Sequence, residues 1–378
     1  MPLHFTPSTP VISDLTLHLR HNQQAGAEQT EIRSTFFPAE WHPQSGVQLT
    51  WPHAATDWAD ILADVDDCFV RIAFEILQHD ELLLVVTPEP DRIRALLAER
   101  LPSRLLPEVR YFECPTNDTW ARDHAFLTLI TETGPRLLDF CFNGWGNKFP
   151  AELDNAINAQ MAKGNCLNSK CTFESHLDFV LEGGSIESDG RGTLMTTSAC
   201  LLSPNRNPGL TRDEIEKRLL HYFHAERVLW LDHGNLAGDD TDSHIDTLAR
   251  FCPNNTIAYV RCTDPADEHY EALSAMESQL KDLTRNYHLV PLPLPDAIYD
   301  PADGHRLPAT YANFLVINGA VLLPTYGQPQ NDDLARRQLQ EAFPKHEILP
   351  VDCRVLIRQH GSLHCSTMQF PVGVLNHL

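Results

Sequence analysis

A segment near the end of the chain, Gly361-Ser362-Leu363-His364-Cys365-Ser366-Thr367, contains a cysteine that could act as a nucleophile. It follows an apolar and basic run, 353–357, which we interpret as a short strand that ends in a polar turn. Cysteine attacks as the thiolate, so Cys365 needs a neighbour that lowers the pKa of its thiol. His364 is adjacent in sequence, but adjacent residues on an extended chain point to opposite faces. We therefore expect the activating base to come from another part of the chain.

Other polar loops contain residues that could complete such a site. Asp123 ends one of them, His244 and Asp246 lie in a second, and Glu182 precedes the pair Gly183-Gly184 in a third. Paired glycines allow positive φ and a close approach of the backbone. Several buried carboxylates are costly unless they face a cation. A guanidinium is a suitable cation because it is planar, always charged and offers five N–H donors in fixed directions, so carboxylates can hold it for attack at its central carbon.

Each of these residues also has a non-catalytic interpretation. A lone cysteine is more often a small buried hydrophobe than a nucleophile. His244 could be an ordinary hydrogen-bonded loop histidine, Asp123 could form a surface ion pair with Arg122, and Glu182 could cap a turn. The other nine cysteines include no CxxC pair, so their spacing predicts no zinc site, and we interpret them as core or inert surface thiols.

The elements that must position these loops alternate between strands and helices. We expect strands at 47–51, 82–86 and 109–114 and helices at 58–79 and 91–101. Apolar residues recur at helical spacing through 58–79 and give that helix one apolar face. Alternation of this kind is typical of an α/β fold.

Part of the pattern occurs twice at a fixed offset of 120 residues. The matched pairs are Leu201-Leu202-Ser203-Pro204 with Val321-Leu322-Leu323-Pro324, Phe223 with Phe343, and 228–232 with 348–352. Continued without a gap, the same offset places His244 opposite His364, one residue before Cys365. A constant offset over about 50 residues indicates duplicated supersecondary units. Units stacked around an axis would bring their loops together, so Asp123, His244, Asp246 and Cys365 are expected to converge.

Composition limits the classes of function. The chain has 378 residues, 42% of them hydrophobic, and a formal net charge of −22, which argues against nucleic acid because phosphate binding needs clustered Lys and Arg. That charge is compatible with a small cationic substrate, although acidity is more often a solubility feature. The sequence contains no run of about 18 apolar residues, so we expect no membrane-spanning helix. We expect residues 1–33 to be a flexible N-terminal arm and 34–378 to form a single catalytic domain.

The N-terminal sequence and the cysteines bear on the compartment. No basic segment followed by an apolar one is found at the N-terminus, so we expect no secretory signal. Ten cysteines without a disulfide-like pattern suit free thiols in a reducing cytoplasm, and we therefore predict a cytoplasmic protein.

Six short motifs occur in the order found in one family. They follow an opening Phe37-Pro38-Ala39-Glu40-Trp41 and Trp51-Pro52-His53, and they are Trp120-Ala121-Arg122-Asp123, Phe142-Asn143-Gly144-Trp145-Gly146, Leu181-Glu182-Gly183-Gly184, Asn205-Arg206-Asn207-Pro208, His244-Ile245-Asp246 and His364-Cys365. The chain resembles the agmatine deiminases and the related Porphyromonas-type peptidylarginine deiminases from about residue 36 to 371. These are guanidine-modifying enzymes of the pentein fold.

The resemblance implies a fold and a set of roles. The fold is an α/β propeller of five ββαβ-type modules around a pseudo-fivefold axis. Cys365 would be the nucleophile and His244 the general acid and base. Asp123 and Asp246 would bind the guanidinium, Glu182 would lie beside His244 and the substrate, and Trp120 would line the entrance. Neither a metal nor an organic cofactor would be needed.

The resemblance also implies an activity, with alternatives. The leading one is agmatine deiminase, which forms N-carbamoylputrescine and ammonia through a covalent amidino-thioether and thereby supplies polyamine synthesis. Free arginine or peptidyl-arginine are alternative substrates, and a non-catalytic pentein that binds a partner is an alternative of another class. The expected partner is a small cationic guanidino compound, with no nucleic acid or membrane, and homo-oligomer formation stays open.

Three stretches depart from the family pattern. They are Arg358-Gln359-His360-Gly361 before the nucleophile, His124-Ala125-Phe126 after Asp123, and 152–170, which we interpret as a loop over the channel. Because these stretches would form the walls of the site, they leave the tail of the substrate open.

Overall fold

The computed structural model describes residues 34–376, and residues 35–376 belong to one compact unit. The arm expected at 1–33 lies outside the described residues, and the domain boundary stays a prediction. Between residues 34 and 376, no helix combines the length and the apolar character needed to cross a membrane.

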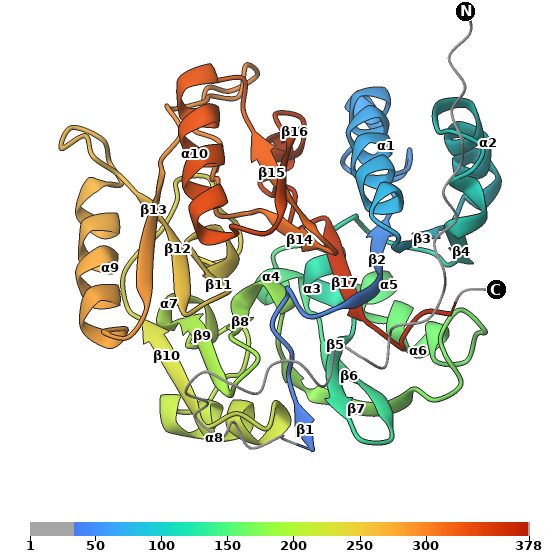
Figure 1. Ribbon diagram of the computed structural model, residues 1–378, viewed down its shortest axis with the longest axis horizontal. Coiled ribbons are helices and arrows are strands. Elements are labelled where there is room, and N and C mark those ends of the chain that lie inside the picture. The colour runs from blue at the N-terminus through green and yellow to red at the C-terminus, as the bar shows by residue number, and fades with distance from the viewer. Residues whose placement is uncertain (1–33, 377–378) are drawn as a thin grey trace, which may run out of the picture. The chain divides into compact units, whose positions relative to one another are not determined.

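Five small sheets built on one plan make up this unit. In each sheet, two strands pair antiparallel, and one of them then pairs in parallel with a strand that follows a helical crossover. Figure 1 shows the five sheets in succession around a common centre, with the C-terminal strand returning beside an N-terminal one. The predicted α/β class and five-module organisation are confirmed.

The first two sheets contain both ends of the described chain. One has the order β17 (Thr367–Pro371), β2 (Gln44–Thr50), β3 (Leu82–Thr87) and β4 (Val109–Glu113), with helices α1 (Leu62–Gln78) and α2 (Pro90–Arg100) in the connections. The other has the order β1 (Thr35–Phe36), β5 (Leu127–Thr131), β6 (Gly134–Cys141) and β7 (Thr172–Val180), with α4 (Gly144–Asn147), α5 (Glu152–Asn155) and α6 (Ile157–Met161) between β6 and β7.

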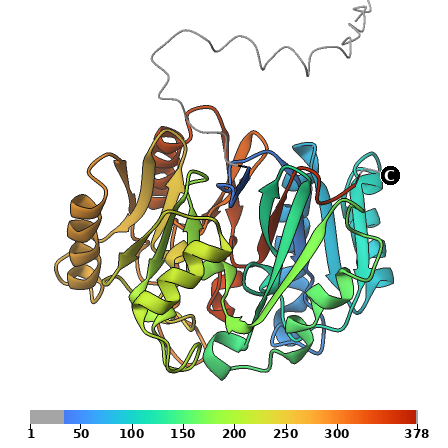
Figure 2. The same ribbon diagram turned by 90° about the horizontal axis from the view of Figure 1, so that it is seen from below.

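The remaining three sheets have three strands each. They are β8 (Ile186–Ser188), β9 (Thr193–Thr197) and β10 (Arg227–Leu231) with α7 (Ser198–Leu201) and α8 (Arg212–Tyr222); β11 (Ala249–Cys252), β12 (Thr256–Arg261) and β13 (His288–Pro293) with α9 (Tyr270–Leu283); and β14 (Leu315–Ile317), β15 (Ala320–Thr325) and β16 (Glu347–Asp352) with α10 (Pro329–Ala342). In Figures 1 and 2 the long helices lie toward the outside and the sheets toward the centre.

Short helical turns occupy the connections between strands. Those between modules are α3 (Ala121–His124) and the 3-10 turns η3 (Gly183–Ser185), η4 (Ile245–Thr247) and η5 (Leu356–Gln359), whereas η1 (Ala59–Ile61) and η2 (Leu106–Glu108) lie in connections within the sheet of β2, β3 and β4. Every residue of β2 and β3 is buried, which explains the continuous apolar run of β3: helices cover one face and the interior of the unit the other. These buried strands fix the positions at which the connecting turns leave the sheets.

Most predicted elements are confirmed to within a few residues, including α1, α2, β2, β3 and β4. The 120-residue offset relates β10 to β16 and the ends of α8 and α10. It fails before those helices: 201–204 lies at the end of α7 and in a turn, and the counterpart of β15 is β9. The prediction that 201–204 matches 321–324 is therefore wrong, because the connection after β9 contains the extra helix α7.

Two predicted segments differ from the structure. The strand expected at 353–357 is wrong: β16 ends at Asp352, the Leu356 N–H donates to the Cys353 carbonyl at 3.0 Å, and a helical turn follows. Its apolar residues were misleading because Leu356 and Ile357 are buried in a turn and not in a sheet. The stretch 152–170 contains α5 and α6 and buries Ile157 and Met161 completely, so it is partly core and not only a loop.

Candidate active site

The predicted reactive residues all lie in turns that connect modules. Asp123 is in α3, His244 directly precedes η4, Asp246 is in η4, and Cys365 lies between η5 and β17. The Cys365 Sγ atom is 3.8 Å from Asp246 Oδ2, and His244 Nδ1 is 3.6 Å from Asp123 Oδ1. The structure therefore brings these four residues together, as the stacking of modules predicts. All four are buried.

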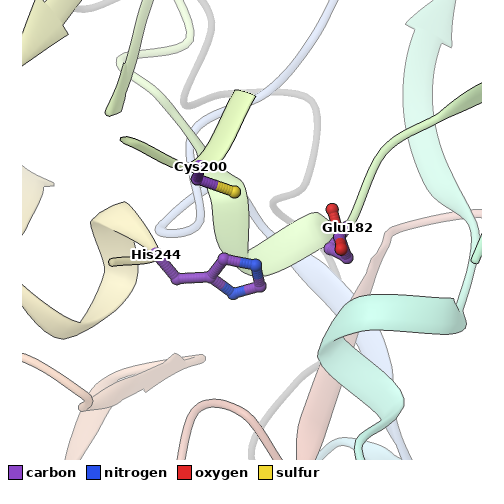
Figure 3. A group of neighbouring side chains, drawn as sticks. All are labelled: Glu182, Cys200 and His244. Carbon is purple, nitrogen blue, oxygen red and sulfur yellow. The ribbon is translucent and has the colours of Figure 1, made fainter. Parts of the chain in front are cut away.

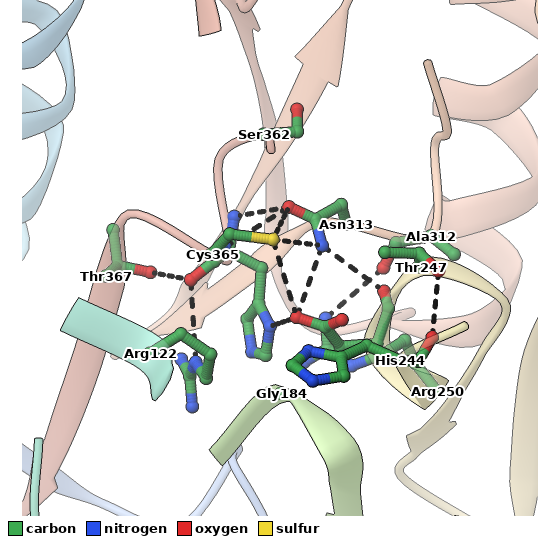
Figure 4. Close-up of polar contacts among 12 residues, drawn as sticks. Arg122, Gly184, His244, Thr247, Arg250, Ala312, Asn313, Ser362, Cys365 and Thr367 are labelled. Carbon is green, nitrogen blue, oxygen red and sulfur yellow. Dashed lines mark hydrogen bonds and ion pairs between the residues drawn. The ribbon is translucent and has the colours of Figure 1, made fainter. Parts of the chain in front are cut away.

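Gly184 marks the point at which three of these side chains meet. A Cβ atom added to it would lie 2.7 Å from His244 Nδ1, 2.8 Å from Asp123 Oδ1 and 3.1 Å from Asp246 Oδ2. Figure 4 shows the backbone at Gly184 close to His244 and facing the side of the site where Cys365 lies. The predicted close approach of the backbone is confirmed, whereas neither Gly183 nor Gly184 adopts a positive φ.

We expect Gly184→Ala to lower kcat/KM by about a hundredfold, because the methyl group must displace His244 or a carboxylate, and misplacing a catalytic group by about 1 Å costs roughly that much. Steady-state kinetics on the guanidino substrate would measure the loss. Gly209→Ala is the control: its Cβ would meet nothing within 4 Å, although its φ of +87° strains the chain. A fall in kcat/KM for Gly209→Ala as large as that for Gly184→Ala would contradict the steric explanation.

Asp123 is held by two neutral donors. Trp145 Nε1 donates to its Oδ2 at 2.9 Å, and the Gly184 N–H donates to its Oδ1 at 3.0 Å. Burial, and then the charge of Asp246, raise the pKa of Asp123 well above its usual range. The negative charge of Asp123 is therefore unfavourable in the empty site and would be stabilised by a bound cation.

Asp246 is ionised more readily than Asp123. Its Oδ2 accepts from His364 Nδ1 at 2.8 Å and from Asn313 Nδ2 at 3.3 Å. Burial alone would raise the pKa of Asp246, but the hydrogen bond and charge of His364 outweigh burial and hold that pKa below its usual value. Asp246 Oδ1 is buried without a hydrogen-bond partner, so this oxygen is available to a donor from a ligand.

His244 is neutral and unpartnered. The residue is fully buried, and neither ring nitrogen has a hydrogen-bond partner among the residues that the structure describes. Burial lowers the pKa of His244 to about 3, opposed in part by the charge of Asp246. A buried polar group without a partner is costly, and such groups are typical of sites that wait for a ligand. His244 and Asp246 together indicate a ligand that carries several N–H donors.

The surroundings of Cys365 favour the protonated thiol. Burial, followed by the charges of Asp246 and Asp123, raises its pKa well above the usual value. Asn313 opposes this shift, with Nδ2 3.3 Å from the sulfur, as Figure 4 shows. A cation bound between the carboxylates would neutralise the charges that disfavour the thiolate. Ligand binding and thiol activation are therefore coupled.

Glu182 lies beside His244, as predicted, but it is already ion-paired. Arg206 Nε donates to its two carboxylate oxygens at 2.9 and 3.0 Å, and both side chains are fully buried. Ligand atoms of Glu182, Cys200 and His244 lie within 4.8 Å of one another (Figure 3). The positive charge of Arg206 opposes a metal cation at this position. The carboxylate of Glu182 is therefore bonded to Arg206, and its predicted role toward the substrate stays a prediction.

A second charged cluster adjoins Cys365 through the neighbouring His364 and was missed by the sequence interpretation. His364 Nε2 contacts Glu40 Oε2 at 2.7 Å, and Arg250 contacts both Glu40 and Glu187. Ligand atoms of Glu40, Glu187 and His364 are grouped within 4.8 Å, but here too an arginine supplies the cation. His364, whose side chain was expected to point away from that of Cys365, thus connects Asp246 to this cluster.

Further residues of the site had no assigned role in the sequence interpretation. Trp145 belongs to a quoted motif, and only the structure shows that it holds Asp123. Asn313 donates to Asp246, accepts from the His364 N–H at 2.9 Å and contacts the Cys365 sulfur. Nothing in the sequence around Asn313 distinguishes it from any other polar residue before a strand.

A cavity of about 130 Å³ leads to Cys365. Its lining residues are Asp57, Asp118, Trp120, Asp123, Trp145, Phe149, Asp240, Thr241, Gln359, His360, Gly361 and Cys365. Among these residues, all from the described part of the chain, four are aspartates, three are large aromatics, and none is Lys or Arg. Trp120 lines the cavity as predicted and packs so tightly on Gly361 that a Cβ there would lie 2.2 Å from the indole ring.

The departures from the family pattern affect this cavity unequally. His360 lines the cavity, as expected for a segment that departs from the family pattern in the walls of the site. His124 is buried away from the cavity lining, with Nε2 3.3 Å from Thr50 Oγ1, and the segment 152–170 contributes no lining residue. The prediction of a loop at 152–170 over the channel is therefore wrong, because its apolar residues pack into the core.

Comparison with known proteins identifies the family. The model of the Porphyromonas-type peptidyl-arginine deiminase family matches residues 36–371. The chain belongs to this family. An agmatine deiminase from Pseudomonas syringae pv. syringae is 33% identical to it over 361 residues, 88% of this chain and 95% of that protein.

Members of the family with known structures share this fold. A Porphyromonas gingivalis protein with the provisional name arginine deiminase is 52% identical, covers 90% of this chain and 100% of its own, and superposes with a TM-score of 0.84. An agmatine deiminase from C. jejuni, solved with substrate bound, is 38% identical, with coverages of 90% and 97% and a TM-score of 0.83. This protein therefore has relatives named for two different guanidino substrates. The residues that line the cavity are the structural evidence for choosing between these substrates.

Proposed function

We propose that the protein is an agmatine deiminase that hydrolyses a guanidinium C–N bond to give N-carbamoylputrescine and ammonia. The observation that supports this most strongly is the cavity at Cys365, where residues 34–376 contribute four aspartates and no Lys or Arg to the lining. Agmatine is cationic at both ends, so it suits this lining. The α-carboxylate of free arginine would enter it without a cationic partner, which costs several kcal/mol for a desolvated charge.

Binding places the guanidinium between Asp123 and Asp246. Its N–H groups donate to the free Oδ1 of Asp246 and to Asp123, and its charge removes the repulsion that keeps the Cys365 thiol protonated. Bound substrate therefore activates its own nucleophile. The neutral ring of His244 accepts the thiol proton as sulfur attacks the guanidinium carbon.

The first half of the reaction releases ammonia. Sulfur attack gives a neutral tetrahedral intermediate, whose nitrogens remain bonded to the carboxylates. His244 returns the proton to one NH2 group, the C–N bond breaks, and ammonia departs. A cationic amidino-thioether on Cys365 remains.

The second half regenerates the thiol. His244 removes a proton from water as the oxygen attacks the amidino carbon. Collapse breaks the C–S bond, forms the ureido carbonyl and returns one proton to sulfur. The other proton passes from His244 to solvent, where it converts the ammonia already released to ammonium. Water is the only co-reactant, so this sequence needs neither a metal nor an organic cofactor.

The second candidate is deimination of free arginine, which is favoured by the 52% identity to the P. gingivalis protein of that provisional name. Ammonia release from agmatine, arginine and an arginine peptide, measured side by side, separates the candidates. We expect kcat/KM for agmatine to exceed that for arginine by at least about two orders of magnitude. Similar values for the two would reassign the protein to the arginine branch, and turnover of the peptide alone would reassign it to the peptidyl branch.

The remaining parts of the proposal concern the cellular compartment and the binding partners of the protein. All ten cysteines are free thiols, which suits a reducing compartment, and we propose that the enzyme acts in the cytoplasm on a small soluble guanidine. The net charge of −22 makes nucleic acid an unsuitable partner.

A further inference from the structure

Asp118 lines the same cavity as Cys365, and three neutral donors fix its carboxylate. Trp58 Nε1 donates to Oδ1 at 2.9 Å, the Thr119 N–H donates to Oδ1 at 2.8 Å, and Trp120 Nε1 donates to Oδ2 at 3.0 Å. The two indole rings lie with their centroids 5.7 Å apart, so the carboxylate is bonded between two packed aromatics. None of these three donors carries a charge that would neutralise Asp118.

The surroundings of Asp118 disfavour an isolated negative charge. Burial raises its pKa to about 6, the donated hydrogen bonds oppose that shift, and the charge of Asp57 adds to it. Asp57 and Asp240 line the same cavity, whose lining contains no Lys or Arg. A cationic group bound at Asp118 would therefore gain more than one bound to a fully solvated carboxylate.

Independent evidence shows that this cavity is built for a ligand. Its lining residues Asp123 and Cys365 adjoin two side chains with unused hydrogen-bonding capacity, His244 and Asp246. Within the described part of the chain, neither ring nitrogen of the fully buried His244 has a hydrogen-bond partner, and Asp246 Oδ1 has none.

Aromatic side chains also line the cavity: Trp120 donates to Asp118, Trp145 donates to Asp123, and Phe149 is a third. The lining thus combines two acids, each bonded to an indole ring, with apolar surface, which suits a molecule with a cation at each end and an alkyl chain between.

We propose that Asp118 binds the distal ammonium group of the substrate and selects guanidines that end in an amine. This inference rests on the proposed function, because the guanidinium must occupy the site at Cys365. Asp118 is a better candidate than the other two acids of the cavity mouth. The Asp57 side chain is exposed, and Asp240 Oδ2 lies 3.6 Å from His360 Nδ1, so both are screened by solvent or by a neighbour.

A pair of substrates tests this role. Agmatine and n-pentylguanidine have chains of the same length, and a methyl group replaces the ammonium group in the second. For Asp118→Asn we expect kcat/KM for agmatine to fall by about ten- to a hundredfold, the value of a charged hydrogen bond. We expect kcat/KM for n-pentylguanidine to change little or to rise, because the neutral tail gains nothing from the charge.

The neutral substrate separates binding from folding. If Asp118 only positions Trp58 and Trp120, both substrates must lose activity equally in Asp118→Asn, and the inference is wrong. Trp58→Phe removes one donor and keeps the charge, so we expect it to preserve the preference for agmatine. A loss of that preference in Trp58→Phe would show that packing, and not charge, selects the tail.

Matched variants test the choice among the three acids. Asp57→Asn and Asp240→Asn should each lower kcat/KM for agmatine by at most about fivefold, as expected for solvent-exposed ion pairs. A selective loss in either of these, with none in Asp118→Asn, would overturn the assignment. If the wild-type protein releases ammonia from neither guanidine, the proposed function fails along with it, whereas a failure at Asp118 alone leaves the deiminase proposal standing.

Discussion

Cys365→Ala is expected to lower ammonia release from agmatine by about four orders of magnitude or more, because the variant cannot form the covalent intermediate. The fold should persist, since the sulfur fills little volume and its neighbours Asn313 and Asp246 are bonded to other groups. Rates would be measured by coupled ammonia detection, with the thermal unfolding midpoint recorded for each variant. Near-normal release from Cys365→Ala would contradict the whole mechanism.

A second cysteine provides the control, and mass spectrometry provides a direct observation. Cys262 is buried after β12, contacts the Asp264 carbonyl and is not among the lining residues of the cavity, so Cys262→Ala should keep its activity. Quenching the wild-type enzyme during turnover should trap an amidino group on the peptide that contains Cys365. An adduct on any other cysteine would show that the nucleophile is misassigned.

The sequence predicts the reactive residues because they lie at equivalent places in repeated units. His244 and His364 are related by a constant offset, and the strands and helices that position them follow simple apolar periodicity. The offset was imperfect where α7 is inserted after β9. The convergence of loops tolerates such an insertion, because the strand ends, and not the length of the connections, determine where the turns meet.

What the sequence could not predict are contacts between distant segments. Glu40 belongs to a quoted motif, yet its hydrogen bond to His364 spans 324 residues and leaves no local pattern. Asn313 likewise contacts the side chains of Asp246 and Cys365, which lie 67 and 52 residues away from it in the sequence. Such residues are buried polar groups whose partners are fixed by the packing of modules, so periodicity and spacing carry no signal for them.

The charge state of the site is also a product of packing. From sequence, Asp123 and Asp246 are equivalent acids. In the structure, Asp246 is held ionised by His364, whereas burial and the charge of Asp246 raise the pKa of Asp123. Environments that separate the pKa values of paired groups give them different tasks. We infer that Asp246 attracts the guanidinium first and that Asp123 gains its charge as the cation arrives.

His244→Gln is expected to lower kcat/KM for agmatine by about two to four orders of magnitude, the usual contribution of general acid–base catalysis. Glutamine is similar in size and polar, but it cannot carry a proton from sulfur to the departing nitrogen. The wild-type ring is suited to that transfer because it is neutral in the empty site, with a pKa of about 3 caused first by burial. His360→Gln is the control, since His360 lines the cavity but lies outside the proposed proton path. It should lose far less activity.

A substrate with a different leaving group separates proton transfer from a structural role of His244. In the S-methylisothiourea analogue of agmatine, attack by Cys365 expels methanethiolate, which departs without prior protonation, whereas an amino group must leave as ammonia. His244→Gln should therefore retain much more of its wild-type rate in a single-turnover release of methanethiol than in release of ammonia. If both rates fall by the same factor, His244 is needed for positioning or for activating the thiol, and its assignment as the acid that protonates ammonia is wrong.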